Sequence, residues 1–388
     1  MPFKKYKLAI DARPAQGRAS GVVTYTRNLI RSLSAIADAF DFLFIVDDTK
    51  SLDDLFFPPG ATFFKTPVGR RNFLRADLWT QWTLPRLLER LDVDVFHQPD
   101  YLIPCRPVPF VLLASYLDAI VFSKEDSRLL LSKKRVQWLM KCGAENADAI
   151  VTISAYSRTR LLEHLSMDPA RLVSIWCGVA EEFFSPPDEK ETKACLEKLD
   201  MTDPFILYYG GFSRRKNVPL LLEAMKNLAT KHPCRLVIAG EAPSEIRFRI
   251  KQMGLQNNVS LFGYATETEL RALLKQCRLF VFPSAMEGFG LPVAEAMASG
   301  APVVCSANGS LPEIAGDAAL LFKPSTPECL AAALYQGLTD NRLCAQLAEK
   351  GKQRAGLFDG SRAARDLGDL YLSLLDRKKA GARKATPF

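Results

Sequence analysis

Residues 279–305, LFVFPSAMEGFGLPVAEAMASGAPVVC, hold one complete unit of a parallel α/β sheet. The apolar runs at 279–283 and 302–305 show little alternation, as expected for parallel strands that are covered on both faces. Between them, Pro292 suits the first turn of a helix and Gly300 suits its end. The stretch therefore predicts strand, loop, helix and strand, and ligands of such sheets bind in the loops at the carboxyl ends of the strands.

The same alternation of strands and helices extends over the whole chain and starts twice. We expect strands at 7–11, 41–46, 61–66, 93–97, 109–114, 149–153, 172–176, 205–210, 235–240, 258–262, 279–283, 302–305 and 319–322. A stretch at 183–204 that is rich in proline and charge is typical of a linker. The predicted fold is α/β, with two Rossmann-like, doubly wound parallel-sheet domains at 1–182 and 205–365 that face a central cleft. A C-terminal helix and basic tail follow at 366–388, and the pattern leaves open whether this helix crosses back to the first domain.

The composition indicates a globular protein of two domains. The chain has 388 residues, of which 48% are hydrophobic and 24% charged, and this length exceeds that of one ordinary domain. Its nine cysteines form no C-x-x-C pair, which favours reduced thiols over a disulfide framework or a zinc site. We find no signal peptide and no apolar stretch long enough to span a membrane, so we expect a cytoplasmic location.

The net charge of +8 is partly concentrated in a segment where cations alternate with aromatic residues. The segment contains Arg70, Arg71, Arg75, Trp79 and Trp82. This spacing fits an ordinary amphipathic helix, and it also fits peripheral contact with an anionic membrane, which would place the protein at the inner face of that membrane. Because no basic recognition motif accompanies the charge, we expect no nucleic-acid partner.

Two loops of the second half carry groups that suit a phosphorylated sugar. In the first, Gly211 is followed by Arg214, Arg215 and Lys216 just before a helix. Cations at a helix N-terminus are unfavourable for the helix alone, whereas a bound diphosphate would offset their repulsion. The second loop joins the predicted strand 279–283 to its helix and contributes two carboxylates, Glu287 and Glu295, and the backbone amides of Gly288, Phe289, Gly290 and Leu291. A carboxylate can accept hydrogen bonds from two neighbouring sugar hydroxyls.

The spacing of the two glutamates in EGFGLPVAE, followed by AMASGAPVV and SLPEIAGDAAL, resembles glycosyltransferase family 4, the retaining transferases of GT-B fold. GGFSRRKN resembles the phosphate loop of that family, and ADAIVTISAYSR resembles its segment before the hinge. IDARPAQGRASGVVTYTRNLIRSL and DVFHQPDYLIP resemble the mannosyltransferase-type branch that builds bacterial surface polysaccharides. The resemblance implies a metal-independent transfer of a hexose, with mannose from GDP-mannose as the first choice, to a glycan or lipid-linked acceptor.

The resemblance also implies a role for individual residues. Lys216 and Arg215 would hold the donor diphosphate, with Gly211 in the same loop. Glu287 and the amides of Gly288 to Leu291 would hold the donor sugar, and Glu295 the ribose. Tyr264 would lie near the base, and Gly21, at the start of the first predicted helix, would pass under the diphosphate from the other domain.

The chain departs from the family pattern at two places. Where family members often have His followed by Asp, this chain has Leu117 and Asp118, which leaves Asp118 as the polar candidate for chemistry on the acceptor side. The hinge motif, usually Pro-Asn-Gly-Val, is Trp-Cys-Gly-Val at 176–179.

We expect no cofactor and no metal ion, since the nucleotide-sugar is a substrate. Asp92 and Asp94 form a D-x-D pair, but they lead into a strand instead of leaving one toward the ligand side. Fixed cations are therefore the expected means of stabilising the leaving diphosphate. His97 ends a strand and could reach an acceptor or could be a core histidine. The alternative functions are a nucleotide-sugar 2-epimerase of the same two-domain plan, a non-catalytic nucleotide-sugar-binding protein and, disfavoured because G-x-G-x-x-G is absent, a nicotinamide-dependent oxidoreductase.

Overall fold

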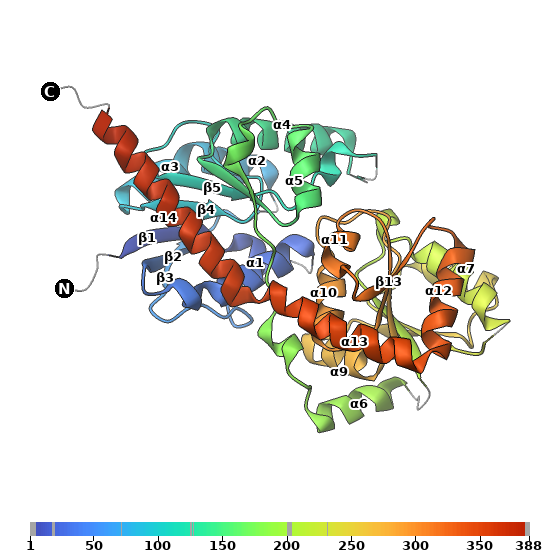
Figure 1. Ribbon diagram of the computed structural model, residues 1–388. Coiled ribbons are helices and arrows are strands. Elements are labelled where there is room, and N and C mark those ends of the chain that lie inside the picture. Colours follow the sequence, from blue (N-terminus) through green and yellow to red (C-terminus); the bar gives the residue numbers. More distant parts are fainter. Residues whose placement is uncertain are drawn as a thin grey trace. The chain divides into compact units, whose positions relative to one another are not determined.

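The computed structural model describes residues 5–17, 20–70, 72–124, 126, 128–199, 204–230 and 232–384. The chain divides into two compact units, which we call unit 1 (residues 1–178 and 359–388) and unit 2 (residues 179–358). Each unit is built around one parallel β-sheet with helices on both faces (Figure 1). The predicted fold class of two Rossmann-like α/β domains is confirmed.

Unit 1 has a seven-stranded sheet of order β3-β2-β1-β4-β5-β6-β7, in which all neighbours are parallel. Its strands are β1 (Tyr6–Asp11), β2 (Phe40–Asp47), β3 (Thr62–Thr66), β4 (Val95–Gln98), β5 (Val111–Ser115), β6 (Ala149–Thr152) and β7 (Leu172–Ser174). Its helices are α1 (Gly21–Ser32), α2 (Phe73–Leu78), the π-helical turn η3 (Trp79–Thr83), α3 (Leu84–Arg90), α4 (Leu130–Asn146), α5 (Ala155–Leu162) and α14 (Gly360–Lys384). The strand order reverses direction between β1 and β4, which is the topological switch point of this sheet.

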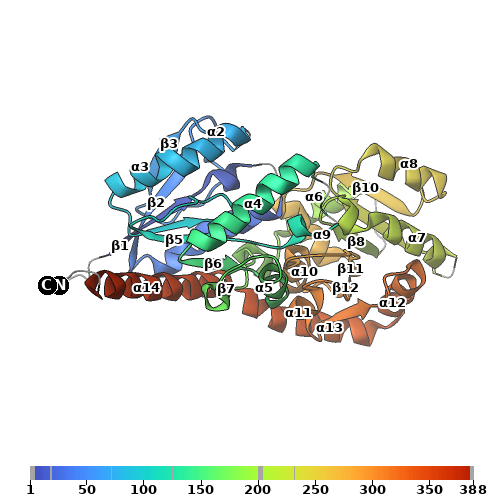
Figure 2. The same cartoon turned by 90° about the horizontal axis from the view of Figure 1, so that it is seen from above.

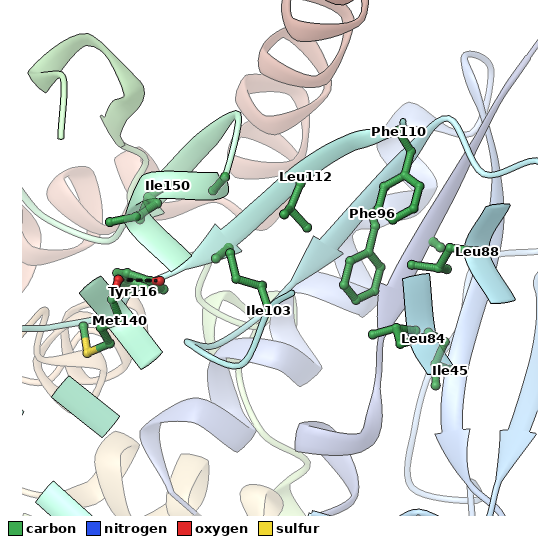
Figure 3. Close-up of a cluster of buried hydrophobic side chains, with 14 of the residues drawn as sticks. Ile45, Leu84, Leu88, Phe96, Ile103, Phe110, Leu112, Tyr116, Met140 and Ile150 are labelled. Carbon is green, nitrogen blue, oxygen red and sulfur yellow. Dashed lines mark hydrogen bonds between the residues drawn. The ribbon is translucent and has the colours of Figure 1, made fainter. Parts of the chain in front are cut away.

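One core cluster of unit 1 lies between the sheet and the helices α3 and α4 (Figure 3), and helix α14 (Gly360–Lys384) packs Tyr371 on Phe40 of β2. Phe96 of β4 and Phe110, just before β5, pack edge to face with ring centroids 6.4 Å apart. The hydroxyl of Tyr116 donates to the carbonyl oxygen of Met140 in α4 at 3.1 Å, so the polar end of this buried ring is satisfied. The apolar strand residues that show no alternation in the sequence are thus covered on both faces.

Unit 2 has a six-stranded parallel sheet of order β10-β9-β8-β11-β12-β13. Its strands are β8 (Phe205–Tyr209), β9 (Arg235–Ala239), β10 (Val259–Gly263), β11 (Leu279–Phe282), β12 (Val303–Ser306) and β13 (Ala319–Phe322). Its helices are α6 (Glu189–Leu199), α7 (Val218–Ala229), α8 (Ser244–Gln252), α9 (Glu267–Gln276), α10 (Leu291–Ala298), α11 (Leu311–Ala315), α12 (Pro327–Thr339) and α13 (Asn341–Ala355). Here the strand order reverses direction between β8 and β11.

The domain boundaries differ from the predicted ones at two places. The stretch at 183–204, predicted as a linker, contains α6, whose buried Cys195 and Leu199 pack it into unit 2 against α9. The last helix starts earlier than predicted and belongs to unit 1 from residue 359 onward. Figures 1 and 2 both show α14 lying along unit 1, where the ring of Tyr371 packs edge to face on Phe40 with centroids 5.7 Å apart.

The two chain crossings between the units run next to each other. Within unit 2, Val179 N donates to Phe358 O at 2.8 Å. Within unit 1, a Cβ atom on Gly178 would lie 2.5 Å from the Cα of Gly360, so this position requires glycine. In the part of the chain that the structure describes, no helix combines the length and the apolarity needed to cross a membrane.

Candidate functional site

The candidate site lies at the carboxyl ends of β8 and β11, where the strand order of unit 2 reverses. The loop after β8 runs through residues 210–217 into α7, and the loop after β11 runs through residues 283–290 into α10. Loops that leave neighbouring strands at such a switch point diverge and leave space for a ligand. The N-termini of two helices are therefore directed at the same edge of the sheet.

A buried ion cluster joins the two loops. The Oε1 atom of Glu287 lies 2.7 Å from Nζ of Lys216 and 2.7 Å from Nη1 of Arg215, and it accepts a hydrogen bond of 2.6 Å from Oγ of Ser284. Burial alone would raise the pKa of Glu287, but the charges of Lys216 and Arg215 outweigh it and lower the pKa below its ordinary value. Glu287 is thus a carboxylate, and the cluster of two cations and one anion has a net charge of +1.

The backbone of the first loop places these cations. Gly210 has a φ of +137°, and a Cβ atom there would lie 2.8 Å from the ring of Phe282. That ring also lies 4.8 Å below Nζ of Lys216. Asn217 is the residue before α7, and its side chain makes no capping hydrogen bond. Its left-handed backbone, with φ of 55°, instead turns the short helix η7 (Arg214–Lys216) directly into α7.

The second loop ends in a left-handed turn that needs glycine. Gly290 precedes α10 with a φ of +100°, and a Cβ atom on it would lie 2.5 Å from Cδ2 of Leu311. Phe289 points into unit 2, where its buried ring packs edge to face on Phe358 with centroids 5.3 Å apart. Gly288 and Leu291 flank this turn. A ligand bound there would contact their backbone amides and not side chains.

Glu295, one turn into α10, is buried instead of lying on the helix surface. Its Oε2 atom accepts a hydrogen bond of 2.8 Å from the hydroxyl of Tyr209, the last residue of β8. Burial raises the pKa of Glu295 to about 7. The carboxyl group is therefore close to half protonated at neutral pH, and it can accept or donate hydrogen bonds to hydroxyl groups.

The remaining predicted residues are not members of this ion cluster. Tyr264 follows β10, the edge strand of the sheet, and its side chain is exposed. Gly211 has a φ of +88° and accepts a hydrogen bond at its carbonyl oxygen from Tyr208 at 2.5 Å. Gly21 and Asp118 belong to unit 1. Gly21 is the first residue of α1, and Asp118 accepts a hydrogen bond of 2.9 Å from the amide of Ile120 in its own turn.

Two family profiles match this chain, one over each half. The profile described as Glycosyltransferase Family 4 matches residues 19–183, and that described as Glycosyl transferases group 1 matches residues 190–354. The chain belongs to glycosyltransferase family 4. The resemblance predicted from EGFGLPVAE and GGFSRRKN is confirmed.

Mannosyltransferases are among the relatives of this family 4 chain. O-antigen chain mannosyltransferase B of Escherichia coli is 29% identical over 256 residues, which cover 64% of this chain and 66% of that protein. The serotype-specific mannosyltransferase WbdA of Escherichia coli is 32% identical over 228 residues, which cover 57% of this chain and 28% of that protein. The matched region thus spans less than two thirds of either relative.

The fold agrees with that of solved glycosyltransferase structures of the GT-B class. Sucrose-phosphate synthase from Thermosynechococcus elongatus matches with a TM-score of 0.77 and 22% identity, over 96% of this chain and 100% of that chain. At this identity the likeness establishes the fold, and the roles of single residues depend on the geometry of this family 4 chain itself.

The sequence prediction missed a third loop that supports the site. Gly309, after β12, has a φ of +63°, and a Cβ atom on it would lie 2.9 Å from both the amide nitrogen and the carbonyl oxygen of Glu287. Next to it, Oγ of Ser310 donates to Phe289 O at 2.8 Å. The turn-forming residues of SANGS, at 306–310, could have indicated this loop in the sequence. Its contact with Glu287 could not be predicted, because only the sheet order brings β12 beside β11.

Unit 1 of this family 4 chain has its own charged cluster at the switch point between β1 and β4, also missed from sequence. Asp11, which ends β1, is bound bidentately by Arg13 at 2.8 and 2.7 Å. Burial would raise the pKa of Asp11, but Arg13 and Arg70 together lower it. Arg70 also pairs with Asp100, beyond the end of β4. The cluster lies at the switch point of the sheet, the edge at which ligands of such folds bind.

This cluster corrects part of the predicted membrane-contact segment. Arg70 is engaged by two carboxylates, and Trp79 is buried with the guanidinium of Arg13 4.3 Å above its ring. Arg71 lies outside the described residues. Arg75 and Trp82 are exposed as predicted. Trp79 and Trp82 differ in exposure because the register of α2 and η3 turns Trp79 toward the core and Trp82 outward.

His97 is a core residue. Its Nδ1 atom lies 2.6 Å from the hydroxyl of Tyr371 and its Nε2 atom 2.7 Å from Oγ of Ser115, and burial lowers its pKa to about 3. Asp94 lies at the amino end of β4, where it accepts a hydrogen bond of 2.8 Å from the amide of Lys7. Among the described residues, no group of three or more His, Cys, Asp and Glu side chains could hold a metal ion.

Proposed function

We propose that this family 4 glycosyltransferase moves a hexose from a nucleotide-sugar to a glycan or lipid-linked acceptor in the synthesis of a surface polysaccharide. The transfer retains the anomeric configuration and needs no metal ion or other cofactor. Mannose from GDP-mannose is the first choice of donor, because mannosyltransferases that act on O-antigen chains are among the relatives. The enzyme works in the cytoplasm, at the inner face of the membrane.

The observation that carries this proposal is the pair of cations on one oxygen of Glu287. Lys216 and Arg215 lie at a helix N-terminus with a net charge of +1 after pairing, which favours a doubly charged diphosphate. As the glycosidic bond of the donor breaks, negative charge grows on the diphosphate, and preorganised cations stabilise that charge more than they stabilise the intact donor. Fixed cations thus take the role that a metal ion has in other transferases.

In the proposed reaction the acceptor hydroxyl attacks the anomeric carbon on the face from which the diphosphate departs. The departing phosphate oxygen takes the proton of that hydroxyl, so the products are a glycoside and a nucleoside diphosphate. This route requires no protein nucleophile. Glu287 and the backbone amides of residues 288–291 would hold the donor sugar, and Glu295 would hold the ribose hydroxyls.

The first test is a panel of nucleotides and nucleotide-sugars in a thermal unfolding assay. A ligand that binds the folded protein raises its stability, and we expect GDP and GDP-mannose to raise Tm more than UDP, ADP or their sugars. A larger rise in Tm with UDP-sugars would mean that the donor is a UDP-sugar and not GDP-mannose. Binding without turnover on any glycan or lipid-linked acceptor would favour a nucleotide-sugar-binding protein.

The second test addresses the chemistry. With a donor that turns over, EDTA should leave the rate unchanged, and NMR of the product should show the anomeric configuration of the donor. Loss of turnover in EDTA that magnesium or manganese restores would contradict metal independence. An inverted linkage would contradict retention.

A further inference from the structure

Exposed apolar side chains of unit 1 are concentrated on two neighbouring helices. Of the fifteen large hydrophobic side chains that are strongly exposed among the described residues, eight belong to α2, η3 and α4 or to the residue just before α4. They are Phe73, Leu74, Leu78, Trp82, Leu129, Leu130, Leu131 and Trp138. Leu131 and Leu129 are each 83% exposed. Scattered exposed apolar residues are ordinary, but a cluster of this size indicates a binding surface.

The two helices form one continuous surface. Arg135 of α4 pairs with Asp77 of α2, with Nε to Oδ2 at 2.6 Å, and its guanidinium carbon lies 4.9 Å above the ring of Phe73. Leu131 and Trp138 are four residues before and three residues after Arg135, so they share its face of α4. The exposed rings and leucines of α2 therefore continue into those of α4. Figures 1 and 2 show both helices on unit 1.

Cations accompany the apolar residues. Helix α4 contains Lys133, Lys134, Arg135 and Lys141 but only one acidic residue, Glu145. Lys134 and Lys141 are exposed, at three and ten residues after Leu131, so they lie beside Leu131 and Trp138 along the helix. The side chain of Arg106 covers the ring of Trp82 with a distance of 5.6 Å to its centroid. Exposed Trp and Leu bordered by Lys and Arg are the composition of helices that lie in a bilayer interface.

We propose that this α2–α4 surface, defined by the eight apolar residues and by Lys134 and Lys141, docks unit 1 on an anionic lipid bilayer. The occupant is a bilayer and not a second copy of the chain, because two such basic faces would repel each other. Docking is interfacial: the leucines and tryptophans enter the headgroup region while the lysines meet anionic lipids. The inference rests on the proposed function for its purpose, since it brings the enzyme to a lipid-linked acceptor.

The test is co-sedimentation of the full-length protein with vesicles, without donor or acceptor. We expect binding to vesicles of phosphatidylcholine mixed with phosphatidylglycerol, weaker binding in high salt, and much weaker binding to phosphatidylcholine alone. Because this readout needs no turnover, an inactive enzyme that still binds vesicles would contradict the proposed function and keep the docking surface. An active enzyme that binds no vesicles would contradict the docking surface and the proposed membrane location, and it would keep the proposed transfer reaction.

Variants locate the surface. Lys134→Gln with Lys141→Gln should weaken binding about 25-fold, at about fivefold for each cation, and Leu131→Ala with Trp138→Ala roughly tenfold or more. The matched control is Phe248→Ala with Lys251→Gln, both exposed on α8 of unit 2, which should bind as the unchanged protein does. All these side chains are exposed, so circular dichroism should show intact folding.

Three results would overturn the proposal. The first is that the protein does not bind the anionic vesicles at low salt. The second is that the α8 control loses as much vesicle binding as the α4 variants. The third is that the α2–α4 surface pairs two copies of the chain. The last would appear as a concentration-dependent dimer that Leu131→Ala with Trp138→Ala abolishes, while vesicle binding is absent.

Discussion

Lys216 is held in position before any ligand binds. Its ammonium group is buried, lies 2.7 Å from Glu287 and sits over the ring of Phe282. If Lys216 holds the diphosphate as proposed, the cation would lose little side-chain freedom on binding it, so its interaction could act on the growing charge of the leaving group. Substitution of Lys216 should therefore affect kcat, whereas substitution of Glu295 should mainly affect the donor KM.

We expect Lys216→Ala to lower kcat for transfer and to raise the donor KM. Loss of one preorganised contact to developing charge typically reduces the rate by about 10²–10³. Glu295→Ala would remove the proposed contacts to ribose hydroxyls, which are similar in the ground and transition states, so it should raise donor KM with a smaller effect on kcat. Steady-state kinetics of both variants, with folding checked by circular dichroism, measure this. Near-normal kcat and donor KM in Lys216→Ala would mean that the diphosphate binds elsewhere.

Glu295 should make stability depend on pH in a defined direction. Its pKa is raised from 4.5 to about 7 in the folded protein, so between these values the folded state binds a proton that the unfolded state releases. The stabilisation is complete below pH about 4.5 and is lost as the pH rises through about 7, by up to roughly 3 kcal/mol. Glu295→Gln, which is neutral throughout, should flatten this part of the profile. Equal slopes for both proteins between pH 5 and 8 in denaturant unfolding would contradict the buried, protonated carboxyl.

Among the helices, α14 is attached to unit 1 by a buried chain of hydrogen bonds. Tyr371 of α14 contacts His97, His97 contacts Ser115, and Oγ of Ser115 lies 2.8 Å from the hydroxyl of Tyr25 in α1. Every member is buried. Such a fully satisfied network fixes the helix position, and losing one member leaves a buried polar atom without a partner.

Tyr371→Phe should therefore destabilise unit 1 by about 1–3 kcal/mol, because Nδ1 of His97 loses its hydrogen-bond partner. The matched control is Tyr335→Phe on α12, whose side chain is 46% exposed; it should change the free energy of unfolding little. Denaturant unfolding followed by circular dichroism gives both values. A Tyr371→Phe protein as stable as the control would show that the network does not hold α14.

At the level of the whole molecule, unit 1 is assembled from two separate parts of the chain. Residues 359–388 return to it after unit 2 is complete. Tyr371 covers Phe40, and a Cβ atom on Gly368 would lie 3.0 Å from Ile36. Helix α14 thus closes a core that residues 1–178 leave open on one side.

Truncation after Phe358 should then unfold or loosen unit 1 and spare unit 2. Hydrogen exchange followed by mass spectrometry should show loss of protection in β1 and β2, since their cover is gone, and near-normal protection in β8 and β9. The full-length protein is the control. Equal protection of β1 and β2 in both proteins would show that residues 1–178 fold without α14.

The pattern of the sequence was sufficient for the strands, the sheet class and the loops of the candidate site. Parallel strands covered on both faces require unbroken apolar runs, and glycines next to helix starts mark close approach of backbone, so both features are visible locally. The family resemblance was likewise contained in short stretches such as EGFGLPVAE. For the same reason Glu287, Lys216 and Arg215 could be singled out, although their ion pairing could not.

Tertiary structure alone decided the features that depend on residues far apart in the chain. The sharing of Glu287 by two cations, the support from Gly309, the burial of Trp79 and Arg70 and the return of α14 to unit 1 all follow from sheet order and helix register. Local periodicity shows which face of an element is apolar but not which element covers it. The partner of a side chain is fixed only when strands that are distant in sequence become neighbours, because packing and hydrogen bonding act through space.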